Sequence, residues 1–280
     1  MRCGMPSAPC LVRAAWLVPA IVLLVGAALA AEPALLFKVS GRVTATLTLS
    51  QLEAKLTPTT VTYFDPYYHK NKTFRCLPMA QVMRAGFGDA WLDGVHTDAV
   101  LTALDGYASQ STAAKLAEEG SCLAFQDVEV PGWEPIGHAQ VSPAPFYLFW
   151  TAPTQGPQHE YPWPWQLASI DLVQFEEAYP QVVPTGAPED SAAARGFKIF
   201  KGRCLRCHAM NQQGGKIGPD LNAPQSIVQY RSKEWLASWT RQPSQYRYTH
   251  MPDHLDLTDQ NLDDLYEYFR WKSQQPEKKP

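Results

Sequence analysis

The residues best suited to chemistry lie in one short motif, Cys-Leu-Arg-Cys-His at residues 204–208. Two thiols separated by two residues and followed at once by an imidazole are the pattern that attaches a c-type haem. Each thiol adds to one of the two haem vinyl groups, and the adjacent imidazole reaches the iron as an axial ligand. A redox Cys-x-x-Cys would need a βαβ context and a zinc site a second ligand pair, and the surrounding sequence offers neither. We therefore expect one haem c, attached through Cys204 and Cys207 and ligated by His208.

A second axial ligand is expected further along the chain. Met251, which a proline follows, is separated from His208 by enough residues for the chain to pass around a haem. Met210 is too close to His208 in sequence to reach the other side of the haem. A thioether raises the reduction potential relative to a second imidazole. Two alternatives stay open: Met251 could be a core residue, or His250 or His254 could be the ligand. With both axial positions filled, such a site has no open position for a substrate and exchanges single electrons.

Helical patterns surround the motif. Ser191 is placed to cap a helix in which Gly196 and Phe200 share one face, and a glycine there permits the close approach of another helix. A short amphipathic helix is predicted over residues 233–239. A last helix is predicted after Thr258, because its apolar residues recur at helical spacing.

Residues 191–272 resemble a class I cytochrome c domain. The resemblance is carried by Gly196 and Phe200, the Cys-Leu-Arg-Cys-His motif, Gly-Pro-Asp-Leu at residues 218–221, the Met-Pro pair and the aromatic last helix. It implies a small all-α fold around one haem. It also implies that His208 and Met251 are the axial ligands and that the carbonyl of Pro219 orients His208.

Four basic residues crowd the attachment segment: Lys198, Lys201, Arg203 and Arg206. A basic rim near the haem edge would attract an acidic redox partner. The other interpretation is an ordinary solvated helix face.

The first 30 residues are typical of a secretory signal peptide. Arg2 and Arg13 precede an apolar run, no acidic residue occurs, and Ala-Leu-Ala at residues 28–30 is a small-x-small cleavage pattern. The run is short for a membrane-spanning helix. We expect an exported, periplasmic protein with no membrane span in the mature chain, the alternative being an uncleaved N-terminal anchor.

Charge and composition divide the rest of the chain in two. Residues 31–190 carry a net charge of −10 and residues 191–280 one of +5, which allows the halves to attract each other or to meet different partners. A Pro- and Gly-rich stretch at residues 179–190 indicates a linker. The chain's net charge of −3 argues against a nucleic-acid partner, and its 45% hydrophobic content argues against disorder.

Residues 31–178 show mixed strand and helix patterns and predict an α+β domain. They resemble the molybdopterin-binding domain of the sulfite-oxidase type in the segments 47–52, 74–86, 105–107 and 163–175. That family holds its metal through a cysteine in a Cys-x-Gly-Asn-like context, which is missing here. Arginines suited to an anionic pterin are also few. We therefore expect a docking domain without molybdopterin.

Cys76 and Cys122 are the remaining cysteines of the mature chain, and both lie in apolar segments. Three interpretations stay open: a disulfide formed in an oxidising compartment, two buried free thiols, or metal ligands.

The sequence thus predicts an exported monohaem cytochrome c that passes electrons between redox proteins, with no catalytic residue of its own. One alternative is an enzyme whose molybdenum centre, with Cys76 as first candidate ligand, feeds electrons to the haem. Another is a haem-bearing subunit of a respiratory complex.

Overall fold

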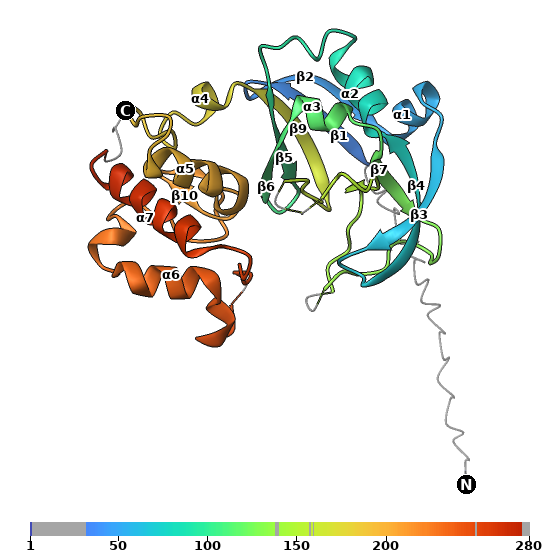
Figure 1. Cartoon of the computed structure of the whole chain (residues 1–280). Helices are drawn as coiled ribbons and strands as arrows, with labels where there is room; N and C mark the ends of the chain where they lie inside the picture. Colours follow the sequence, from blue (N-terminus) through green and yellow to red (C-terminus); the bar gives the residue numbers. More distant parts are fainter. Residues whose placement is uncertain (2–31, 138–139, 157, 159, 250, 276–280) are drawn as a thin grey trace. The chain divides into compact units, whose positions relative to one another are not determined.

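The computed structural model of the chain describes residues 1, 32–137, 140–156, 158, 160–249 and 251–275 (Figure 1). The predicted signal peptide therefore lies outside the described residues, apart from Met1. Among the residues that are described, no helix combines the length and apolar character needed to cross a membrane.

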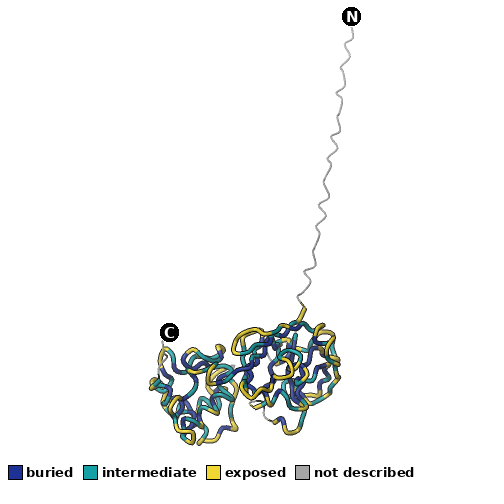
Figure 2. Tube along the Cα trace, turned by 90° about the horizontal axis from the view of Figure 1, so that it is seen from above, coloured by how far each residue is buried: buried dark blue, intermediate teal, exposed yellow. Residues whose placement is uncertain are grey.

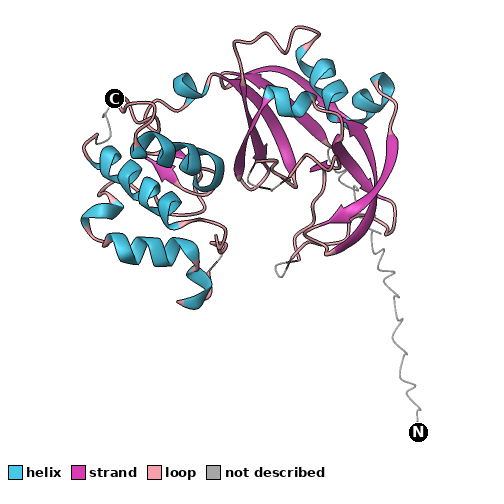
Figure 3. Cartoon of the chain, viewed as in Figure 1, coloured by secondary structure: helices cyan, strands magenta, loops and turns pink. Residues whose placement is uncertain are grey.

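The N-terminal region contains two β-sheets. The first has the strand order β2-β1-β9-β5-β6, with β1 parallel to β9 and its other neighbours antiparallel. Its strands are β1 (Ala34–Val39), β2 (Arg42–Thr48), β5 (Asp98–Ala103), β6 (Ala108–Thr112) and β9 (Leu167–Val173). The second is antiparallel in the order β3-β4-β7-β8, with strands β3 (Thr59–Asp65), β4 (Lys70–Pro78), β7 (Ser121–Asp127) and β8 (Tyr147–Trp150). Figure 3 shows both sheets in magenta.

Three short helices complete this region: α1 (Leu49–Lys55), α2 (Met79–Phe87) and α3 (Ala113–Ala117). The cap of α1 is local, because Thr48 and Gln51 form a reciprocal capping box. Helix α2 packs against β2 of the first sheet and against β4 and β7 of the second. The apolar residues of both sheets and the helices therefore form one continuous core, and the predicted α+β character is confirmed.

The C-terminal region is mainly helical and has a second core. Its elements are α4 (Phe175–Ala178), α5 (Ala192–Ile199), the π-helical turn η1 (Phe200–Cys204), β10 (Ala209–Met210), β11 (Gln213–Gly214), the 3₁₀ turns η2 (Ile227–Gln229) and η3 (Pro243–Gln245), α6 (Lys233–Arg241) and α7 (Asp259–Ser273). The buried positions are dark blue in Figure 2.

The stretch that the sequence indicates as a linker contributes to this second core. Val182 is fully buried in it, and the hydroxyl of Tyr268 donates a hydrogen bond of 2.7 Å to the carbonyl of Val182. Phe175, which precedes this stretch, is fully buried in the same core. The ammonium of Lys272 donates to the carbonyl of Val183 at 3.1 Å. The Pro and Gly residues suggested an open connection, but the apolar residues among them find partners on α7. In packing terms, the boundary between the regions therefore falls between β9 and α4.

A buried ion cluster fixes one end of the four-stranded sheet. The ammonium of Lys72 lies 2.8 Å from Asp127, 2.9 Å from Glu134 and 3.1 Å from Glu129. The side chains of Lys72 and Asp127 are fully buried, and Lys72 is the cation that compensates the buried charge of Asp127.

Replacing Lys72 by Met should therefore leave Asp127 buried and uncompensated. We expect the free energy of unfolding to fall by about 3–5 kcal/mol, measured by urea denaturation of the full chain. The matched control is Lys70→Met, since half-exposed Lys70 also pairs with Glu134 and its loss should change stability by less than about 1 kcal/mol. Equal effects of the two substitutions would contradict this role for Lys72.

Candidate functional site: the cysteine and histidine turn

Helix α5 leads directly into the attachment motif. The predicted cap is confirmed, because Ser191 Oγ accepts a hydrogen bond from the amide of Ala194 at 3.2 Å. The helix then widens into the π-helical turn η1, which ends at Cys204. Its fully buried Phe200 packs at 5.2 Å, centroid to centroid, against the ring of Tyr268 on α7. The motif thus begins at the end of an anchored helix.

Cys204, Cys207 and His208 share one tight turn. The amides of Cys207 and His208 both donate to the carbonyl of Cys204, at 3.0 and 2.8 Å. Burial raises the pKa of the Cys204 thiol to about 12 and also raises that of Cys207. Without haem, both sulfurs are therefore protonated at neutral pH. The turn brings together two thiols and one imidazole, which is the donor set for a covalently attached, axially ligated haem.

His208 is held from the side of its Nδ1 atom. Nδ1 lies 2.8 Å from the carbonyl oxygen of Pro219, and because a carbonyl only accepts, Nδ1 carries the proton. Nε2 is then the unprotonated nitrogen that can bind a metal. Burial lowers the pKa of His208, which favours the same neutral form. The carbonyl of Pro219 is therefore in position to orient the ring of His208.

The loop before Pro219 leaves space for the imidazole only because it carries a glycine. The amide of Gly218 donates to the carbonyl of Cys207 at 2.7 Å. A Cβ atom at this position would lie 2.5 Å from Cε1 of His208, which is closer than real Cβ atoms approach. The cradle of the imidazole is therefore shaped for a ring held as an axial ligand, and the residues present fit a c-type haem.

The predicted close approach of two helices occurs at Gly196. A Cβ atom there would collide with the backbone carbonyl of Asp264 on α7. Beside this contact the guanidinium of Arg195 pairs with the carboxylate of Asp264 through two bonds of 2.8 Å. This bidentate pair lowers the pKa of Asp264, chiefly through the hydrogen bonds from Arg195. The α5–α7 crossing thereby fixes where the attachment turn begins.

Met251 lies in the loop between η3 and α7. It is half-buried, and its amide donates to Thr249 Oγ1 at 3.1 Å. The amide of His254 donates to the carbonyl of Arg241 at 2.9 Å, which ties the loop to the end of α6. His250, the other alternative ligand, lies outside the described residues.

An ion pair joins this loop to the attachment segment. The guanidinium of Arg203 binds the carboxylate of Asp256 through bonds of 3.0 and 2.6 Å. Sequence reasoning did not find Asp256, because no spacing rule relates two charges so far apart in the chain. The pair connects the two segments that carry the expected axial ligands.

The four basic residues do not form a uniformly free rim. Lys201 pairs with Asp98 at 2.7 Å and lies over the ring of Phe175. Arg203 binds Asp256, and Arg206 donates to the carbonyl of Gly202. Lys198 is exposed. Two of the four charges thus have carboxylate partners within the chain, and attraction of an acidic redox partner by this segment stays a prediction.

Three large apolar or aromatic side chains close in sequence to the expected haem ligands are exposed. Ile217, Tyr248 and Leu255 expose 56, 87 and 64% of their area. These residues flank the Gly-Pro loop and the Met251 loop in sequence. Exposed apolar groups are suited to short-lived contact with another protein.

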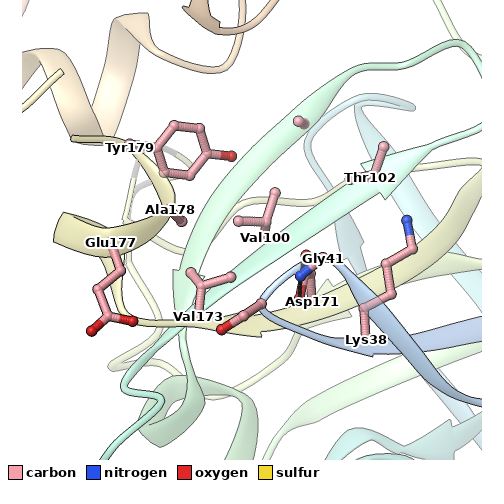
Figure 4. A pocket seen from close by; sticks show the side chains of 11 residues that line it. Lys38, Gly41, Val100, Thr102, Asp171, Val173, Glu177, Ala178 and Tyr179 are labelled. Atoms are coloured by element: carbon pink, nitrogen blue, oxygen red, sulfur yellow. Dashed lines mark hydrogen bonds between the residues drawn. The ribbon is translucent and has the colours of Figure 1, made fainter. Parts of the chain in front are cut away.

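A pocket of about 510 Å³ is lined by residues of the five-stranded sheet and of the segment around α4 (Figure 4). Its lining includes Lys38, Asp171, Glu177 and Tyr179. Both carboxylate oxygens of Asp171 accept from the amide of Gly41, at 3.1 and 2.9 Å. None of the residues predicted as site residues lines it.

The two N-terminal cysteines are close together. Their sulfurs lie 3.0 Å apart, and both residues are buried. Within the described ranges, no group of three or more His, Cys, Asp or Glu side chains is arranged to hold a metal ion.

Residues 193–273 match the family model of cytochrome c. No curated protein sequence matches the chain. Together with the turn geometry, the match identifies the C-terminal region as a cytochrome c domain, which implies covalently bound haem c and a role in electron transfer. The matched segment includes Cys204, Cys207, His208, Pro219 and Met251.

Replacing Gly218 by Ala should displace the ring of His208. We expect a several-fold fall in the fraction of chains that carry covalent haem, measured from haem absorbance per chain after denaturing electrophoresis. The matched control is Gly156→Ala, because a Cβ atom at Gly156 meets nothing within 4 Å. Normal haem content in the Gly218 variant would refute the steric role of this glycine.

Proposed function

We propose that this chain is an exported, single-haem cytochrome c that transfers single electrons between periplasmic redox partners and docks one of them through its N-terminal domain. The observation that carries the proposal is the turn at residues 204–208, whose histidine is oriented by Pro219 within a cytochrome c domain. Iron in a bound haem supplies reversible one-electron exchange.

The chain's own residues determine how that exchange proceeds. Cys204 and Cys207 would hold the group covalently, so it would be retained at any dilution. His208 offers Nε2 because its Nδ1 proton is engaged by the carbonyl of Pro219. Met251 would supply the second ligand to the iron, which would leave no site for a substrate and limit the domain to electron transfer.

Export and docking rest on charge and composition. The apolar segment within the first 30 residues resembles a cleavable leader, and a Cys-x-x-Cys-His motif in an exported protein is typical of covalent haem attachment. The N-terminal domain is strongly acidic and the haem domain basic, and Lys201 and Asp98 form one ion pair between them. The remaining acidic surface of the N-terminal domain is available to select a redox partner. The proposal includes a sulfite-oxidase-type fold for this domain, which serves for docking and binds no molybdopterin.

Metal content separates the electron carrier from a molybdenum enzyme. The purified protein should contain one iron atom per chain and no molybdenum, measured by inductively coupled plasma mass spectrometry. The haem should be seen as a single c-type pyridine haemochrome. Molybdenum approaching one atom per chain would overturn the docking role.

Replacing Met251 by Ala tests the second axial ligand. Haem should stay attached, because both thioether bonds remain, but the absorption spectrum should change and the reduction potential should fall. The matched variant His254→Ala should keep the spectrum of the parent protein. An unchanged spectrum in the Met251 variant would exclude this residue as ligand.

A further inference from the structure

A second pair of cysteines lies in the N-terminal domain, far in sequence from the haem motif. Cys76 is on β4 and Cys122 on the neighbouring strand β7. The two sulfurs are 3.0 Å apart although 46 residues separate them in the chain. Cys76 is 0% and Cys122 7% exposed.

The strand register explains this proximity. Cys76 is paired with Ala124, and Cys122 with Pro78, in the antiparallel ladder between β4 and β7. Side chains two residues apart on one strand point to the same face, so both cysteines project from one side of the sheet. The ladder is irregular between Arg75 and Cys76. The sulfurs therefore face each other diagonally across two adjacent strands.

The surroundings favour bond formation between the sulfurs over metal binding. The hydroxyl of Thr59 also lies beside the pair, 3.6 Å from the sulfur of Cys76. Two sulfurs without a third strong ligand are a poor site for zinc, which takes four ligands. Two thiols this close in an oxidising compartment are, by contrast, suited to a disulfide.

We propose that Cys76 and Cys122 are joined by a disulfide that clamps β4 to β7 in the exported protein. This inference rests on the export included in the proposed function, but it does not depend on electron transfer. The oxidant is a protein disulfide of the thiol oxidoreductase class. One thiolate of the pair attacks that disulfide to give a mixed disulfide and one free donor thiol.

The second thiolate of the pair then attacks the chain's own sulfur in this mixed disulfide and displaces the donor sulfur bound to it. The Cys76–Cys122 bond forms, the donor leaves as a dithiol, and the two thiol protons of the pair end on the donor. The exchange must precede or accompany closure of the sheet, because the folded strands bury both sulfurs. The bond closes a loop that contains α2, β5, β6 and α3, and it leaves Cys204 and Cys207 as the thiols available for haem.

Thiol counting on the holoprotein tests the bond directly. The full chain is produced with haem in a bacterial periplasm, denatured in iodoacetamide and mapped by peptide mass spectrometry, with and without prior reduction. We expect a cross-linked pair of peptides containing Cys76 and Cys122, and alkylation of both residues only after reduction. Alkylation of both without reductant would overturn the proposal.

The same sample distinguishes this failure from failure of the proposed function. A c-type haem spectrum with free Cys76 and Cys122 would refute the disulfide and leave the electron carrier standing. A cross-linked pair in a protein that binds no haem would do the reverse. Peptide mapping keeps the two results apart because it reports Cys204 and Cys207 separately.

Stability gives a second readout. Reductant should raise the unfolding equilibrium constant of the parent N-terminal domain by roughly 100-fold or more, since the cross-link restricts a long loop in the unfolded chain. The matched control is the double variant Cys76→Ala/Cys122→Ala, whose urea midpoint should be insensitive to reductant. A parent midpoint that reductant does not move would contradict the clamp.

Discussion

The hydrogen bond between His208 Nδ1 and the carbonyl of Pro219 is the interaction on which the haem domain's chemistry depends. It fixes the protonated nitrogen and so leaves Nε2 available as a ligand. It also fixes the plane of the ring, and that plane is possible only because Gly218 has no side chain. The cysteine turn and the Gly-Pro loop both contact this histidine.

Sequence reasoning succeeded where the physical cause is local. The caps at Ser191 and Thr258 depend on a hydroxyl and an amide three residues away, and both are present. The haem motif depends on spacing within five residues. The close approach at Gly196 could also be expected, because a glycine on an apolar helix face has few other uses.

The remaining features come from contacts between distant segments. No local pattern pairs Arg203 with Asp256, or Lys72 with three carboxylates from the segment 127–134. The linker prediction missed the core residues of its segment, because Pro and Gly mark an irregular backbone but do not show whether neighbouring side chains are buried. In the N-terminal domain, the order of the strands determines which cysteines meet, and no short motif predicts that order.

The burial of Phe175 and Val182 has a consequence for where the haem domain begins. The matched segment starts at residue 193, yet the hydroxyl of Tyr268 and the ammonium of Lys272 find their partners upstream of it. A fragment cut at that boundary would remove the carbonyl that accepts from the buried Tyr268 hydroxyl, whereas the ammonium of Lys272 would keep Gln275 Oε1, which lies 3.2 Å away. The core of the haem domain thus includes residues that precede the matched segment. A haem domain made on its own would have to begin before Phe175 to keep these contacts.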